Sequence, residues 1–186
     1  EGHIYEKQLV EVAHSSGMRL IGPNCVGIYA PRSGLSFFPQ LTKEPGPVGL
    51  VSHSGSLAQL ISYVGPKWGI RFSKAVNLGN ECDLTSSDFL LYLAQDAETQ
   101  LIGAYIEGIK DGARFFDALY AASLKKPVIL WKTGLTSAGA QAAASHTGAM
   151  LNSDMAVDAL FRKAGIIRCN SRGELTAIGA VLQHRK

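Results

Sequence analysis

The 186-residue sequence is short of several residue types, and each shortage excludes a class of protein. It has three cysteines, Cys25, Cys82 and Cys169, which lie far apart and lack the Cys-x-x-Cys or Cys/His spacing of a metal site. An odd, scattered set of cysteines favours a reduced intracellular environment over a secreted disulfide scaffold. No apolar run is long enough to cross a bilayer, and no segment resembles a signal peptide. We therefore expect a soluble cytoplasmic protein with no membrane partner and no resident metal.

Charge is also scarce, since charged residues make up 18% of the chain and the formal net charge is +3. Lysine and arginine are spread along the sequence and are not interleaved with aromatic residues, so the pattern does not predict a nucleic-acid partner. Hydrophobic residues, in contrast, make up 46% of the chain. That supply is enough for one well-buried domain with a small appendage.

Short apolar runs alternate with amphipathic stretches over most of the chain. The runs predict buried strands at residues 48–51, 72–76, 101–106, 127–131 and 166–168. The stretches between and after them predict helices at residues 57–68, 87–95, 112–124, 153–164 and 174–183. Strands that alternate with helices predict an α/β fold, a flavodoxin-like doubly wound parallel sheet covered on both faces. In such folds ligands bind beyond the carboxyl ends of the strands.

The beginning of the chain has a different pattern. It predicts a helix at residues 5–14, a strand at 18–21 and a sharp turn at 22–25, followed by a proline-containing connector at 29–47. One helix and one strand cannot form a core of their own. We therefore expect residues 1–43 to be the tail of a preceding domain plus a connector, and residues 44–186 to form the main domain.

The first candidate site is the strand-to-helix junction that holds Ser52, Ser54, Gly55 and Ser56. Successive backbone amides at such a junction point outward and can bind an anion, with help from the positive end of the helix dipole. The serine hydroxyls can donate further hydrogen bonds, and the glycine allows close approach. A simpler interpretation is that Ser54 caps the helix. The two interpretations are compatible.

The same junction admits a hydrolase hypothesis. Ser54 stands between small residues on a strand-to-helix turn, as a serine nucleophile does in a loose form of the nucleophile elbow. An acid such as Asp88 or Glu107, followed by His146, would complete the chain order of an α/β-hydrolase triad.

The second candidate is Glu107, which follows an apolar strand and so lies at the ligand-binding edge expected for a doubly wound sheet. A carboxylate there can accept the N–H of one imidazole nitrogen and leave the other nitrogen free to attack. The alternatives are a solvated turn residue or a cap for the helix that begins near Gly112.

The third candidate is His146, which stands in a run of small residues. Ser145 and Thr147 offer hydroxyls that can hold an anion, and Gly148 permits backbone angles that most residues avoid. A histidine with open space and small polar neighbours suits a transferable group better than a packed core. The alternative is a loop with an incidental histidine.

These pieces, in this order, resemble the nucleoside-diphosphate-forming acyl-CoA synthetases over nearly the whole chain. The resemblance is closest to the α-type part of the ADP-forming acetate enzymes and more distant to the succinyl-CoA synthetase α subunit. It rests on Ser52-His53-Ser54-Gly55-Ser56, Leu78-Gly79-Asn80, the run from Tyr105 to Gly112, and the run from Ala144 to Ala149. The turn Gly22-Pro23-Asn24-Cys25 resembles the closing turn of the family's Rossmann-like CoA-binding domain.

The resemblance implies a succinyl-CoA synthetase-like flavodoxin domain within an acid–thiol ligase. ATP would phosphorylate the histidine matching His146, an acyl phosphate would form, and CoA would displace phosphate to give a thioester. Glu107 would orient the histidine, amides at Ser54–Ser56 would hold its phosphate, and Asn24 and Cys25 would lie by the acyl and CoA site.

The resemblance also implies partners. ATP with Mg²⁺ would bind an ATP-grasp subunit or domain that the sequence lacks, the acid would be a small carboxylic acid, and the assembly would be an oligomer. We therefore expect this segment to be inactive alone. Two features depart from the family: the first domain's Gly-rich CoA-phosphate loop is missing, and Met150-Leu151-Asn152 replaces a glycine-containing segment. A non-catalytic, acyl-CoA-sensing module of a protein acetyltransferase is the alternative.

Overall fold

The computed structural model describes residues 2–133 and 154–183. Within these residues the strands are β1 (Gly27–Tyr29), β2 (Val48–Ser52), β3 (Phe72–Asn77), β4 (Leu101–Ile106), β5 (Val128–Lys132) and β6 (Ile167–Cys169). The α-helices are α1 (Gly2–Ser15), α2 (Gly55–Val64), α3 (Ser86–Gln95), α4 (Gly112–Ser123), α6 (Asp154–Lys163) and α7 (Arg172–Leu182). Two short 3₁₀ helices are η1 (Pro31–Ser33) and η2 (Gly65–Trp68).

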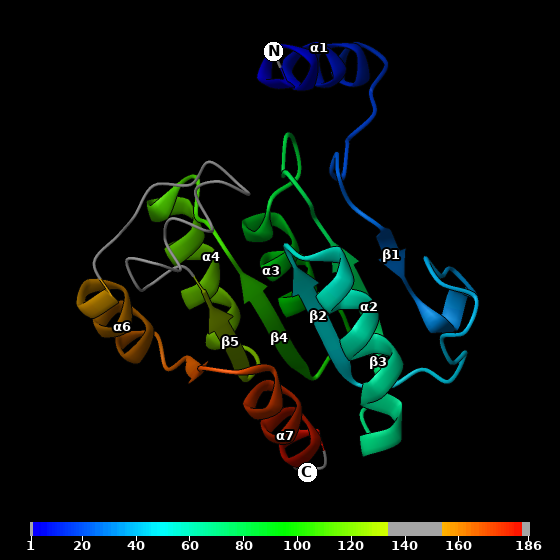
Figure 1. Ribbon diagram of the computed structural model, residues 1–186. Helices are drawn as coiled ribbons and strands as arrows, with labels where there is room; N and C mark the ends of the chain where they lie inside the picture. The colour runs from blue at the N-terminus through cyan, green and yellow to red at the C-terminus, as the bar shows by residue number, and fades with distance from the viewer. Residues whose placement is uncertain (1, 134–153, 184–186) are drawn as a thin grey trace.

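The strands form one sheet in the order β1-β3-β2-β4-β5-β6 (Figure 1). The strands from β2 to β6 are parallel, and β1 alone of the described strands runs antiparallel, against β3. Counted along the chain from β2, the parallel strands have the order 2-1-3-4-5 of flavodoxin-like folds. The predicted doubly wound α/β architecture is therefore confirmed. Its topological switch point lies between β2 and β4.

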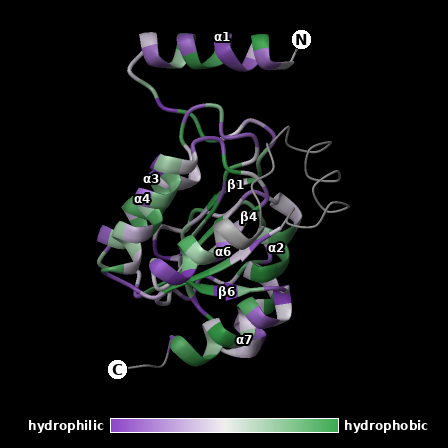
Figure 2. Cartoon of the chain, turned by 90° about the vertical axis from the view of Figure 1, so that its left-hand side faces the viewer, coloured by the Kyte–Doolittle hydropathy of each residue, from purple (hydrophilic) through white to green (hydrophobic). Residues whose placement is uncertain are grey.

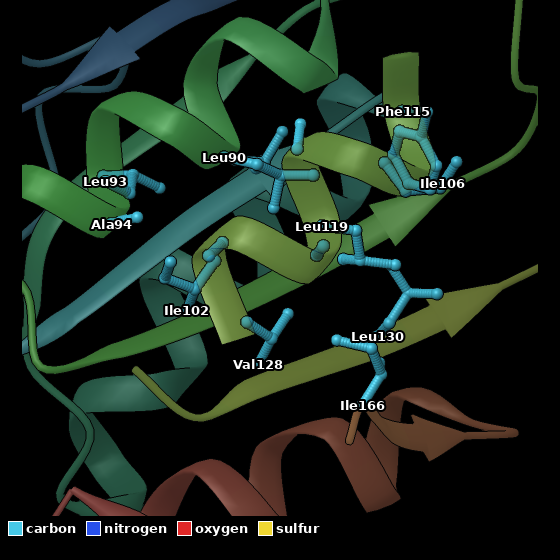
Figure 3. Close-up of a cluster of buried hydrophobic side chains, with 14 of the residues drawn as sticks. Leu90, Leu93, Ala94, Ile102, Ile106, Phe115, Leu119, Val128, Leu130 and Ile166 are labelled. Atoms are coloured by element: carbon cyan, nitrogen blue, oxygen red, sulfur yellow. The ribbon is translucent and has the colours of Figure 1, made fainter. Parts of the chain in front are cut away.

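Helices cover both faces of the sheet. On one face, side chains of α3 and α4 converge on β4 and β5, as Figure 3 shows for Leu90, Phe115, Leu119 and Leu130. On the other face, α2 and α7 pack over β2, β3 and β5, around a second buried cluster that includes Phe72. Because both faces are buried, the parallel strands read as continuous apolar runs in the sequence.

The N-terminal part differs from its prediction. Residues 18–21 were expected as a strand, and they are not one. A single backbone bond, from the Leu84 amide to the Leu20 carbonyl, joins this stretch to the loop after β3, so no ladder forms. The added strand is instead β1, between the turn expected at 22–25 and the connector expected at 29–47, and Tyr29 and Leu41 of that connector are buried in the core.

Helix α1 stands apart from the sheet (Figures 1 and 2). No helix among the described residues is long and apolar enough to span a membrane. In the same residues no three histidine, cysteine or acidic side chains come together as metal ligands.

Candidate functional site

The turn between β2 and α2 lies at the switch point. Ser54 is the N-cap of α2, and its Oγ accepts the Leu57 amide at 3.3 Å and lies 3.2 Å from Ser56 Oγ. Ser52 is fully buried, and its hydroxyl donates to the Ser54 carbonyl at 2.8 Å. The Ser52 side chain therefore shapes the turn, while Ser54, Gly55 and Ser56 form the start of the helix.

Asn77, at the end of β3, joins this turn to the N-terminal segment. Its buried amide donates to the carbonyls of Ser52 and His53 at 2.9 and 3.0 Å. Its Oδ1 accepts the Val26 amide at 2.7 Å. A Cβ on Gly55 would lie 3.1 Å from Asn77 Oδ1 and 3.2 Å from Val26 Cγ1, so glycine lets the three segments meet.

Asn24 and Cys25 come directly before this junction. Asn24 has a left-handed backbone, with φ of 55°, and its side-chain amide donates to Asn80 Oδ1 at 3.3 Å. The Asn80 amide in turn donates to the Pro23 carbonyl at 2.9 Å. Gly79 permits this approach, because a Cβ there would lie 2.2 Å from the Pro23 oxygen. The structure thus brings the Asn24–Cys25 turn beside the β2–α2 turn.

Glu107 follows β4, the strand that pairs with β2 at the switch point. The His53 amide donates to the Tyr105 carbonyl at 3.0 Å, so the ends of the two strands are direct neighbours. Asp111, whose side chain accepts the Arg114 amide, is the N-cap of α4. Glu107 is therefore not the cap of that helix, which was one alternative for it.

Polar groups surround Glu107. Lys132 Nζ, at the end of β5, donates to the Glu107 carbonyl at 2.7 Å. Burial raises the pKa of the Tyr105 phenol, the Thr133 hydroxyl opposes that rise, and the nearby Glu107 carboxylate adds to it. The half-buried carboxyl group thus lies at the carboxyl end of the sheet, close to a phenol.

A buried pair next to Glu107 was not identified from the sequence. His53 Nε2 lies 3.2 Å from Glu81 Oε1, in the loop after β3, and each side chain is 5% exposed. His53 Nδ1 accepts the Glu107 amide at 3.3 Å. Burial raises the pKa of the Glu81 carboxyl, but His53 and the Ser86 amide outweigh burial and lower it. The pair cannot be read from spacing, because its members come from separate loops.

Four predicted residues, His146, Ser145, Thr147 and Gly148, lie outside the described residues. The hydrolase hypothesis also needs His146.

Two residues of the hydrolase hypothesis, Ser54 and Asp88, are engaged elsewhere. Ser54 caps α2, and Asp88 accepts the Thr85 amide and hydroxyl at the start of α3 and pairs with Arg114. These contacts account for Ser54 without a nucleophilic role and for Asp88 without a role as the triad acid, which leaves Glu107 as the acid of that hypothesis.

Three of the predicted motifs thus converge at one edge of the sheet. They are the helix start at Ser54–Ser56, the Asn24–Cys25 turn and the carboxylate of Glu107. The first amides of a helix have no partner within the helix and bind anions. The site can therefore hold a phosphoryl group beside a carboxylate that accepts hydrogen bonds.

Known protein sequences match most of this chain. A family model described as "succinyl-CoA ligase like flavodoxin domain" matches residues 45–182. The α subunit of acetate–CoA ligase (ADP-forming) II from Pyrococcus furiosus is 42% identical over 178 residues, which are 96% of this chain and 39% of the relative. The 4-hydroxybutyrate–CoA ligase (ADP-forming) from Nitrosopumilus maritimus is 37% identical over 94% of this chain and 26% of the relative.

A solved structure of an enzyme of the same kind also matches this chain. The dinucleotide-forming acetyl-coenzyme A synthetase 1 of Ca. Korarchaeum cryptofilum, in complex with phosphate and ADP, superposes with a TM-score of 0.89 at 35% identity. The match covers 97% of this chain and 40% of that one. The chain therefore spans less than half the length of the relatives described here.

Proposed function

The chain belongs to the family of succinyl-CoA ligase-like flavodoxin domains. We propose that it carries the phosphohistidine of an ADP-forming acyl-CoA synthetase. The whole enzyme would join a small carboxylic acid to CoA, with conversion of ATP to ADP and phosphate. The observation that carries the proposal is the meeting of an anion-binding helix start and Glu107 at the switch point between β2 and β4.

His146 is the proposed carrier. In the first transfer an imidazole nitrogen forms a bond to the γ-phosphorus of ATP, the bond to the bridging oxygen breaks, and ADP leaves. In the second, a carboxylate oxygen of the acid takes the phosphoryl group, which regenerates the imidazole and gives an acyl phosphate. The CoA sulfur then attacks the acyl carbon and releases phosphate. Two transfers replace one difficult condensation, as in other covalent catalysis.

The described residues have distinct proposed roles. Glu107 accepts the N–H of the imidazole, which leaves the other nitrogen free to carry the phosphoryl group. The amides at Ser54–Ser56 bind the phosphoryl oxygens, with Ser145, Thr147 and Gly148 as further donors. Ser52 is not in this set, because its hydroxyl is bound to Ser54. Asn24 and Cys25 line the acyl and CoA side.

The remaining parts belong to the rest of the enzyme. Residues 1–43 are the proposed end of a CoA-binding domain, and ATP with Mg²⁺ would bind an ATP-grasp subunit or domain in an oligomer. The cytoplasm is the proposed location, because all three cysteines, Cys25, Cys82 and Cys169, are free. Acids as different as acetate and 4-hydroxybutyrate appear in the names of relatives, so the proposal specifies a small carboxylic acid only.

The test is phosphorylation of the full-length enzyme by γ-labelled MgATP. We expect an acid-labile, base-stable label that His146→Ala removes. The control is His3→Ala, which changes a fully exposed histidine on α1 and should leave the label intact. A label that survives in His146→Ala would refute the proposal. A wild-type enzyme without any label would favour the non-catalytic sensing module.

Glu107→Gln tests the role of the carboxylate. The amide keeps an acceptor oxygen but loses the charge, so we expect slower phosphorylation from ATP and slower transfer to the acid, with the fold retained. An unchanged rate for both transfers would remove Glu107 from the mechanism.

A further inference from the structure

His53 connects three loops at the carboxyl edge of the sheet. It lies in the loop after β2, accepts the amide of Glu107 after β4, and faces Glu81 after β3. The ring is buried, although histidine is polar on both edges. Burial of a polar side chain costs free energy unless its polar atoms find hydrogen-bond partners. Here both nitrogens face polar groups of other loops.

The contacts assign a different role to each ring nitrogen. A backbone amide can only donate, so Nδ1 of His53 must present its lone pair to the Glu107 N–H. Nδ1 therefore acts as the acceptor, and Nε2 lies 3.2 Å from the Glu81 carboxyl oxygen. The Nε2 alignment falls outside hydrogen-bond geometry, so this contact is an electrostatic attraction at short range.

Glu81 is itself held firmly. Its Oε1 accepts the Ser86 amide at the start of α3, and its backbone is left-handed, with φ of 52°. Lys110 Nζ donates to the carbonyls of Asn80 and Glu81 at 2.6 and 3.1 Å. His53 thus links the peptide of Glu107 to a loop whose position is fixed.

We infer that His53 is a positioning residue for Glu107, acting through the Nδ1 bond that anchors the Glu107 peptide at the switch point. This inference rests on the proposed function. Lys132 holds the carbonyl of the same residue. The side chain of Glu107 therefore starts from a backbone held on both its amide and its carbonyl. Loss of the His53 bond would let the carboxylate move away from its place at the switch point.

The test uses the full-length enzyme and single-turnover phosphorylation of His146 by MgATP. His53→Leu removes both polar contacts, and we expect phosphorylation to slow by about 10- to 100-fold, since misplacement of a catalytic group by ~1 Å has effects of this size. The KM for ATP should not change. His53→Asn can offer an amide oxygen near the place of Nδ1, and it should recover a large part of the rate.

A second arm separates positioning from general support of the fold. If His53 acts through Glu107, then His53→Leu should have little further effect in a Glu107→Gln enzyme, because coupled residues are not additive. An equal loss of rate in both backgrounds, or no loss in either, would overturn the inference. If His53→Leu does not fold, His53→Gln replaces it, since it stays polar but loses the acceptor at Nδ1.

The two proposals fail in different ways. A label that survives in His146→Ala refutes the proposed function. A label that depends on His146 but is formed at the wild-type rate in His53→Leu refutes only the positioning role.

Discussion

The N-terminal segment, residues 2–26, and the sheet domain are held in place by different forces. In the sheet domain, side chains from α3, α4, β4 and β5 are buried together, and many of them are fully inaccessible. On α1 the one buried residue is Ala13, whereas Ile4, Tyr5, Leu9 and Val12 are each more than half exposed. Burial of apolar surface therefore does not hold α1 in place.

Within this segment Ile21 packs against the core cluster, and polar contacts with the loop after β3 hold the rest. Asp83 accepts bonds from His14, from Arg19 and from the Leu20 amide, the last at 2.7 Å. Near it, the Cys82 amide donates to the Gly22 carbonyl at 2.9 Å. Burial is non-directional, but these bonds require particular atoms in particular places. The polar contacts therefore specify where the Asn24–Cys25 turn lies, while the core supplies stability.

The largest expected effect is in the core. Leu130→Ala empties space at a fully buried position, and we expect a loss of about 2–5 kcal/mol in the free energy of opening of β4 and β5. Hydrogen exchange of the amides of these strands, in the full-length protein, measures it. Leu124→Ala is the matched control, since Leu124 is 70% exposed. Equal losses in the two variants would break the comparison.

A smaller and local effect is expected from Asp83→Asn. The Asp83 side chain is 3% exposed and accepts from a guanidinium and an amide, so we expect its change to weaken residues 18–24 by on the order of 2 kcal/mol. Exchange of the Leu20 and Leu84 amides should quicken, while β4 and β5 stay protected.

Glu44→Gln is the control for Asp83→Asn. It removes a carboxylate that also pairs with an arginine, Arg71, at 2.8 Å, but this carboxylate is mostly exposed. An exposed pair contributes at most about 1 kcal/mol. Global unfolding in Asp83→Asn would show that the segment is part of the core after all.

The smallest effect is expected from acid. The Arg19 guanidinium, above all, holds the pKa of the Asp83 carboxyl well below its usual range, with help from the Leu20 amide and His14. A depressed folded pKa means that this carboxyl's contribution is complete above its unfolded pKa of about 3.9 and is lost as the pH falls toward the folded value.

Titration of the Asp83 carboxyl by NMR tests this expectation. Its midpoint should lie far below that of an ordinary aspartate, and the protection of the Leu20 amide should decline only at strongly acidic pH. A midpoint near 3.9 would mean that the arginine contact is absent in solution.

The sheet domain was predictable from the sequence because its elements follow hydrophobic period. The parallel strands and the helices between them lie where apolar runs and amphipathic stretches predicted them. One difference is local: the helix expected at residues 57–68 divides into α2 and η2 at Gly65 and Pro66. Proline lacks the amide that a continued α-helix needs at that position.

The N-terminal segment and β1 were predicted less well because their contacts are non-local. Residues 18–21 have the composition of a strand, but the loop after β3 engages them through Asp83 and a single backbone bond. β1 is three residues long and depends on pairing with β3. Neither feature has a periodic signal within its own stretch of sequence.

By itself the sequence determined the layers of the domain, the parallel order of its runs and the motifs at the strand ends, because hydrophobic period and turn residues act locally. Only the tertiary structure decided which loops meet at the switch point, and it alone revealed His53 between Glu81 and Glu107. The physical reason is that these contacts join atoms far apart in the chain, and strand order alone decides which of them become neighbours.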